Sequence, residues 1–202
     1  MKGFVITGTS GVGKTHLEIE LAKLINFYQL PKYTNRPGRP GESSATVISM
    51  SAQEFKKIDR GKGFVFTLEY GGFDYGWKQS EASANSDKYL TLGVTLESLK
   101  RIFEFLPKFK PILLTVDKKN IELIRKRMYK REDFTKLYGD DKEKLEQKIE
   151  SRLNLALKEL ENIKEYEKIV LSHSGKVFLI KDNRTLYKEV IPWVLTQTDS
   201  DQ

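Results

Sequence analysis

Cysteine is absent from this sequence of 202 residues, and histidine occurs only twice. Without thiols the chain has no disulfide framework, no cysteine-based zinc site and no thiol nucleophile. Long apolar runs are missing too: the run at residues 169–171 is typical, whereas a membrane helix needs about 20 apolar residues. We therefore expect a globular, cytoplasmic protein of one domain that does not bind a membrane.

Basic residues outnumber acidic ones by 35 to 28, which gives a net charge of +7. Such an excess favours an anionic ligand. Lysine and glutamate alternate through residues 118–168, so much of this charge is expected on a solvated surface. No stretch combines basic residues with interleaved stacking aromatics, and we expect no nucleic-acid partner.

Apolar residues alternate along the chain between strand-like runs and helical spacing, which predicts an α/β sheet covered on both faces. The first strand is expected at residues 3–7, and Leu17 to Tyr28 predict a helix that ends at about residue 28. Residues 63–75 are aromatic and rich in glycine, as in a small sheet or hairpin. Further strands are expected at residues 89–94, 111–116, 167–171 and 177–180, and further helices at 96–106, 120–130, 145–163 and from 182 onward.

One helix start is explicit in the sequence. Ser51 and Glu54 stand in a capping-box pattern, in which each side chain can accept a hydrogen bond from a free backbone N–H group of the first turn. A short helix should therefore begin at about Ala52. At the other end of the chain, we expect residues 196–202 to be a disordered tail.

The most specific motif is a complete G-x-x-x-x-G-K-[ST] pattern between the first strand and the first helix. Its glycines let backbone N–H groups surround phosphate oxygens, its lysine adds a mobile positive charge, and its final hydroxyl can bind Mg²⁺. The pattern predicts a nucleoside triphosphate site at Gly8, Thr9, Ser10, Gly11, Val12, Gly13, Lys14 and Thr15. A GTPase would have a guanine-reading N-K-x-D loop after a later strand, and a motor or transporter ATPase would have a strand ending in two acids. The sequence has neither feature, so a small-molecule kinase is expected.

A second anion site is predicted in the loop T-N-R-P-G-R-P-G-E at residues 34–42. Arg36 and Arg39 lie three residues apart between prolines and glycines that stiffen the loop. Two guanidinium groups held in this way suit the capture of one phosphate monoester. The alternative is that both arginines are ordinary solvated side chains.

With these motifs the chain resembles the guanylate kinase family of nucleoside monophosphate kinases over residues 3–172. The loop at 34–42 is similar to the family's T-T-R-x-P-R-x-G-E, and residues 127–131 are similar to the lid's R-L-x-x-R. Residues 149–156 resemble I-x-x-R-L-x-x-A, and residues 166–172 resemble the strand Y-D-x-V-I-x-N. The segments S-A-Q-E-F and G-G-F-D-Y-G occur in the family's order as well.

This resemblance implies one domain at residues 1–195, with a three-layer P-loop kinase core and a parallel sheet. The core would comprise residues 1–31, 81–126 and 149–195, a β-rich acceptor lobe would comprise 32–80, and a lid would comprise 127–148.

The resemblance also implies the roles of individual residues. ATP with Mg²⁺ would bind the phosphate loop, where Thr15 would hold the metal and Lys14 would face the phosphates. The triphosphate would be enclosed by Arg131, Arg152 and Arg127, and the acceptor phosphate would be held by Arg36, Arg39 and Tyr75. The protein would act as a monomer or homodimer.

The sequence departs from the family where the family reads guanine. Phe66 stands in place of the base-reading glutamate, and Trp77 in place of a serine or threonine. Both rings could stack on a base or close the pocket around a smaller compound. Glu69 could supply a displaced carboxylate, or it could be a solvated strand residue. The family's G-x-D-Y segment has no counterpart in residues 43–49.

The acids of the family's L-D-x-D strand are missing as well, because residues 90–93 read L-T-L-G. Asp117 could substitute for them, although an aspartate at this point also suits a helix cap. The leading hypothesis is phosphorylation of GMP or dGMP by ATP. The alternatives are a kinase of another nucleoside monophosphate or a ribose phosphate, and a non-catalytic binding module of the same fold.

Overall fold

A computed structural model describes residues 1–38, 42–131 and 140–199 of the chain. The fold is α/β, as predicted, and its larger sheet has five strands in the order β2-β7-β1-β8-β9. These strands are β1 (Lys2–Gly8), β2 (Phe27–Gln29), β7 (Tyr89–Gly93), β8 (Phe109–Thr115) and β9 (Lys176–Leu179). Among the described residues, those within 1–6 and 15–111 form one compact unit, and those within 7–14 and 112–199 form a second.

In the first unit, β7 pairs in parallel with both β1 and β2. The strands approach closely at Gly3, because a Cβ atom there would lie 2.0 Å from the carbonyl oxygen of Leu90. The rings of Phe4, Phe27 and Tyr89 pack together in the core, with centroids 5.7–6.2 Å apart. The unit also contains the helices α1 (Lys14–Ala22), α3 (Gln79–Ala84) and α4 (Leu99–Phe105).

The predicted end of the first helix at about residue 28 is wrong. Helix α1 ends at Ala22, and the chain then enters strand β2. Ile25 is 88% exposed, so its helical spacing does not mark a buried face. Phe27 instead joins the sheet edge opposite Tyr89, and this pairing between distant residues overrides the local periodicity.

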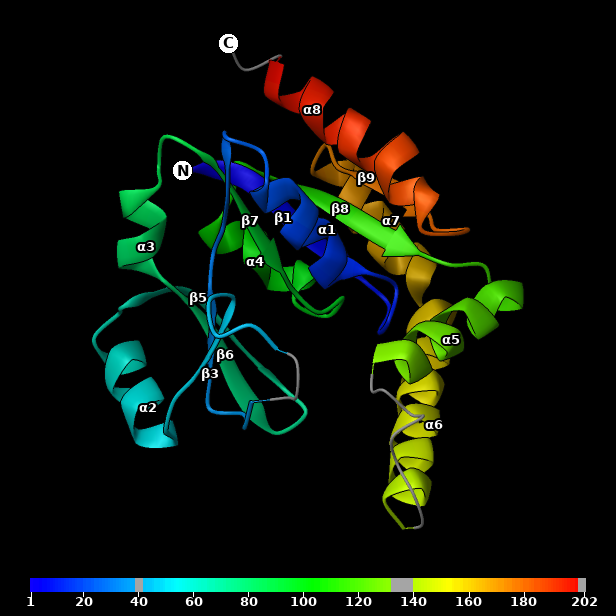
Figure 1. The fold of residues 1–202 in the computed structure, drawn as a ribbon. Coiled ribbons are helices and arrows are strands. Elements are labelled where there is room, and N and C mark those ends of the chain that lie inside the picture. Colours follow the sequence, from blue (N-terminus) through cyan, green and yellow to red (C-terminus); the bar gives the residue numbers. More distant parts are fainter. Residues whose placement is uncertain (39–41, 132–139, 200–202) are drawn as a thin grey trace. The chain divides into compact units, whose positions relative to one another are not determined.

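A smaller sheet, with strand order β4-β3-β6-β5, lies within the expected acceptor lobe. Its strands are β3 (Lys32–Thr34), β4 (Val47–Ser49), β5 (Phe64–Tyr70) and β6 (Phe73–Lys78), and the expected hairpin is the antiparallel pair β5–β6. Helix α2 (Ala52–Arg60) lies beside this sheet (Figure 1). The capping box is confirmed, because the Glu54 amide donates to the Ser51 hydroxyl and the Ser51 amide donates to the Glu54 carboxylate.

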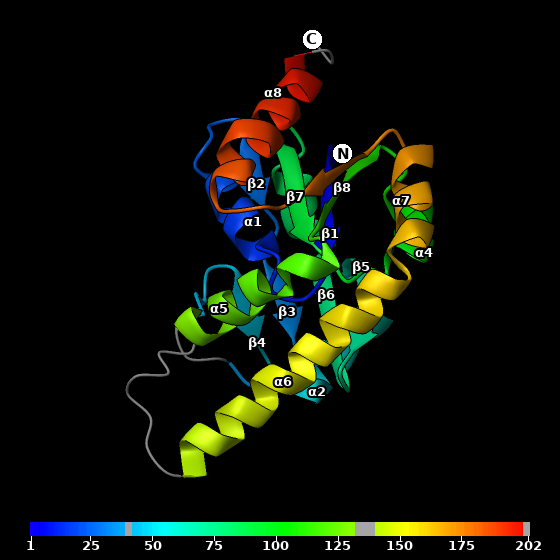
Figure 2. The same ribbon diagram turned by 90° about the vertical axis from the view of Figure 1, so that its right-hand side faces the viewer.

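The second unit contains the parallel pair β8–β9 and most of the remaining helices. These helices are η1 (Lys118–Asn120), α5 (Ile121–Arg131), α6 (Asp140–Glu161), α7 (Ile163–Ser172), η3 (Leu186–Val190) and α8 (Ile191–Asp199). Helix α5 packs across the long helix α6 (Figure 2).

Two other predictions differ from the structure in this unit. Residues 167–171 form part of helix α7 rather than a strand: Val170 is fully buried but its neighbour Leu171 is 62% exposed, as on a helix with one apolar face. Residues 196–199 belong to helix α8 rather than to a disordered tail, and residues 200–202 lie outside the described part of the chain. Within the described ranges, none of the helices has the length and apolar character needed to cross a membrane.

Candidate nucleotide-binding site

The phosphate loop has the backbone geometry that its glycines predict. Gly8, Gly11 and Gly13 have φ angles of 145°, 81° and 113°, a region that side chains disfavour. A Cβ atom on Gly8 would lie 2.0 Å from the carbonyl oxygen of Leu114, and one on Gly11 would lie 2.8 Å from Ile124. Two of the three glycines are therefore required by space as well as by conformation.

Lys14 turns back onto this loop. Its ammonium group donates hydrogen bonds to the carbonyl oxygens of Gly8, at 2.6 Å, and Thr9, at 3.1 Å. The cation is thus held over the loop, where it can reach a phosphate by rotating its flexible side chain. Thr15, the predicted Mg²⁺ ligand, is exposed on the first turn of α1.

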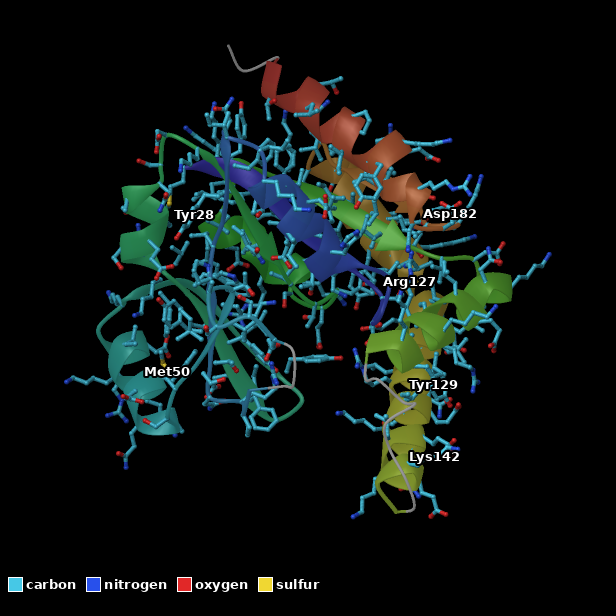
Figure 3. The ribbon with its side chains drawn as sticks, in the orientation of Figure 1. Tyr28, Met50, Arg127, Tyr129, Lys142 and Asp182 are labelled. Carbon is cyan, nitrogen blue, oxygen red and sulfur yellow. The ribbon has the colours of Figure 1, made fainter. Side chains whose placement is uncertain are left out.

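Arg127 reaches the loop from α5. It donates to the carbonyl oxygen of Val12 and to the side chain of Asn183, both at 2.7 Å. Burial lowers the pKa of this arginine, and the nearby charge of Asp182 acts in the opposite direction; Figure 3 labels both residues. Arg127 therefore supports the backbone of the loop, and Asn183 was not predicted to take part.

Helix α6 contributes two further side chains. Arg152 places a guanidinium nitrogen 3.5 Å from the hydroxyl of Ser10, and its predicted role toward the triphosphate stays a prediction. Glu159 accepts a hydrogen bond of 2.9 Å from the Ser10 amide. Burial raises the pKa of Glu159, while the Ser10 amide and the charge of Lys14 oppose that rise. Sequence reasoning missed Glu159, because its partner lies 149 residues away.

Arg131 is the last residue of α5, but its side chain is outside the described part of the structure. The same holds for residues 132–139 of the expected lid and for Arg39. The predicted roles of Arg131 and Arg39 stay predictions.

Arg36, in the first unit, is 8% exposed and is paired within its own loop. Its guanidinium group donates to both carboxylate oxygens of Glu42, at 2.8 and 2.6 Å, and to the carbonyl oxygen of Pro37. It is therefore not an ordinary solvated arginine. A buried cation needs such partners, and an incoming phosphate would have to compete with Glu42.

Strands β5 and β6 position the other acceptor-site candidates. Tyr75 is half-buried on β6, opposite Leu68. Glu69 is exposed on β5, opposite Asp74, as expected for a solvated strand residue. Asn35 and Asp74 exchange three hydrogen bonds, of 2.7, 2.9 and 3.4 Å, and so fix the start of the arginine loop to β6.

Phe66 and Trp77 do not present their rings to solvent. They are 4% and 1% exposed, and their ring centroids lie 6.1 Å apart. Phe66 also packs against Phe105 of α4, at 5.5 Å. The suggestion that these rings stack on a base is therefore not supported: they fill the core, because apolar side chains on one strand face pack against the neighbouring element.

The end of β7 has no acid, as the sequence indicated. Thr91 and Gly93 occupy the places of the family's two aspartates. Helix α1 nevertheless brings a carboxylate to this point, because Glu18 is 4% exposed and lies against Gly93. The signal in the sequence was an acid between Leu17 and Leu21 on the apolar face of the helix, which is rare without a function or a partner.

Asp117 is the N-cap of η1, since its side chain accepts a hydrogen bond of 2.9 Å from the Lys119 amide. The described residues contain no cluster of three or more His, Asp or Glu side chains able to hold a metal ion by themselves. A hydroxyl at Thr15 and a carboxylate at Glu18 fit Mg²⁺, which commonly takes one or two protein oxygens and completes its shell with phosphate and water.

Comparisons with known proteins find similar sequences and a similar fold among guanylate kinases. Guanylate kinases from two strains of Thermus thermophilus are each 25% identical to this chain over 172 residues, which is 84% of this chain and 73% or 72% of theirs. The crystal structure of guanylate kinase from Anaplasma phagocytophilum superposes with a TM-score of 0.64 at 15% identity, over 99% of this chain and 85% of that one. No family model matches the chain. In sequence and in fold, the chain is similar to guanylate kinases.

Proposed function

We propose that this protein transfers the γ-phosphoryl group of ATP to a nucleoside monophosphate, with GMP or dGMP as the acceptor. The observation that carries the proposal is the phosphate loop, whose three glycines have the required backbone angles and whose lysine is held over the loop. The relatives that the chain matches over most of its length are guanylate kinases, which favours this acceptor over a ribose phosphate.

Phosphoryl transfer needs positioning and positive charge rather than a covalent intermediate. Lys14 and Arg152 would neutralise charge on the migrating group, together with Arg131 from the proposed lid. Arg127 would keep the loop in shape through its bond to Val12. Mg²⁺, when bound, would neutralise phosphate charge, and Thr15 would be one of its ligands.

The acceptor phosphate would bind to Arg36, Arg39 and Tyr75. Arg36 is already oriented by Glu42, so less side-chain freedom is lost when a phosphate binds. The guanine-reading glutamate of the family is absent here, and Glu69 is the nearest carboxylate along β5. Specificity for the base is therefore the part of the proposal that most needs measurement.

The test is ADP formation from ATP and Mg²⁺ with GMP, dGMP, AMP, CMP, UMP, dTMP and ribose 1,5-bisphosphate as separate acceptors. We expect turnover to be fastest with GMP or dGMP. Lys14→Ala should lower it by about 100-fold or more, since it removes a charge that stabilises the transition state. Lys23→Ala is the matched control, because Lys23 is exposed and forms a surface ion pair with Glu20 on the same helix.

Each outcome of this assay has a clear meaning. Faster turnover of another acceptor would retain the kinase but replace GMP as its substrate. An absence of turnover with every acceptor, for a protein that still binds ATP, would favour the non-catalytic module.

A further inference from the structure

The carboxyl end of β7 lacks the acids that the resemblance leads one to expect there. Thr91 and Gly93 lie two residues apart on this strand, so they share one face of the sheet. Thr91 is fully buried, and its hydroxyl has no hydrogen-bond partner among the described residues. Such a group is normally satisfied by protein, water or a ligand. The face of β7 that carries Thr91 and Gly93 is therefore polar, although neither residue is an acid.

Glu18 fills the space beside Gly93. A Cβ atom built on Gly93 would lie 2.5 Å from one carboxylate oxygen of Glu18, 3.0 Å from the other and 2.9 Å from the carbon between them. The three heavy atoms nearest to that Cβ position all belong to Glu18. The carboxylate therefore stands where a side chain of residue 93 would begin, and glycine is the residue that leaves room for it.

Glu18 also lies one helical turn after Thr15. Side chains three residues apart share a helix face, and a helical side chain points back toward the N-terminus. These two rules favour a carboxylate directed along α1 toward the turn that carries the Thr15 hydroxyl. Glu18 is 4% exposed, and a buried carboxylate gains from cations and donors near it, so a metal ion would be a favourable neighbour here.

We propose that Glu18 supplies, from helix α1, the carboxylate that strand β7 lacks, and that Glu18 and Thr15 together hold the Mg²⁺ of the bound nucleotide. In the family's pattern the acid belongs to the strand, whereas here it belongs to helix α1. In both cases the carboxylate lies at the end of β7. This inference rests on the proposed function, because it assumes that the phosphate loop binds ATP with Mg²⁺.

The test measures binding rather than turnover. Calorimetry gives the affinity for a non-hydrolysable ATP analogue with Mg²⁺ and with EDTA, and the ratio of the two is the gain due to the metal. Glu18→Gln keeps the shape of the side chain, and we expect it to reduce this gain by about tenfold or more, as is typical when a group that orients a metal is removed. The affinity in EDTA should not change. Glu20→Gln, at a partly exposed position on the same helix, should retain the full gain.

A charge relocation gives a second and more specific test. Glu18→Ala should lose the gain due to Mg²⁺, and it also clears the atoms nearest to Gly93. The double variant Glu18→Ala/Gly93→Asp returns an acid to the strand and should recover part of the gain. Thermal unfolding without ligand shows whether each variant is folded.

The outcomes separate this inference from the proposed function. If the unmodified protein binds no ATP analogue, both are overturned. If it shows a gain from Mg²⁺ that Glu18→Gln retains, only the role of Glu18 is overturned. A Glu18→Gln variant that binds more weakly in EDTA as well would assign the residue a structural role instead.

Discussion

Glu159 illustrates what one half-buried side chain contributes to the phosphate loop. Its carboxylate accepts the Ser10 amide, so this N–H group is satisfied before any nucleotide binds. Burial raises its pKa above about 4.5, the ordinary value for glutamate, despite the opposing effects of Ser10 and Lys14. A raised pKa means that the protonated form of this carboxyl group is favoured in the folded protein.

This shift predicts a dependence of stability on pH. The contribution of Glu159 should be fully present below pH 4.5 and should fall as pH rises through its raised pKa, because the folded state then holds a proton that the unfolded state has released. Glu159→Gln has no such titration. The free energy of unfolding of the variant should therefore improve, relative to the unmodified protein, as pH rises from 4.5 to 7.

Denaturant unfolding at several pH values measures this difference. Glu161→Gln, an exposed position on the same helix, should show no such trend. A difference between Glu159→Gln and the unmodified protein that does not vary with pH would contradict the assignment.

At the scale of single elements, local sequence determines helix α2 well and helix α7 poorly. The capping box of α2 lies within four residues, so its hydrogen bonds could be predicted from the pattern alone. Helix α7 carries apolar residues in an uninterrupted run, which suits a buried strand as well as a helix. In the structure β9 pairs with β8, whereas the apolar run lies in helix α7 and joins neither strand.

The cap of α2 gives a prediction at this scale. Ser51→Ala removes the hydroxyl that accepts the Glu54 amide, and it should lower the free energy of unfolding by about 1 kcal/mol. Ser80→Ala, at an exposed position of α3, is the control and should have an effect close to zero. Equal effects of the two substitutions would show that the cap does not stabilise the helix.

At the scale of the whole molecule, nucleotide binding should be visible as thermal stabilisation. A ligand at 100 times its dissociation constant adds about 2.7 kcal/mol to the free energy of unfolding. For a chain of this size, that corresponds to a rise in Tm of roughly 5–10 °C. We expect ATP with Mg²⁺ to produce this rise in the unmodified protein and to produce little in Lys14→Ala, as followed by circular dichroism. An unchanged Tm at saturating ATP would argue against the phosphate-loop assignment.

The sequence by itself determined the α/β class, the phosphate loop, the α2 cap and the likeness to guanylate kinases. Each of these depends on backbone conformation or on spacing over a few residues, so neighbouring positions carry the information.

Only the tertiary structure decided which distant groups meet. It brought Glu159 to Ser10, Arg127 to Val12 and Glu18 to Gly93, and it buried Phe66 with Trp77. Such pairings depend on how separate elements pack, and no local pattern along the chain specifies the partner of a buried charge or ring.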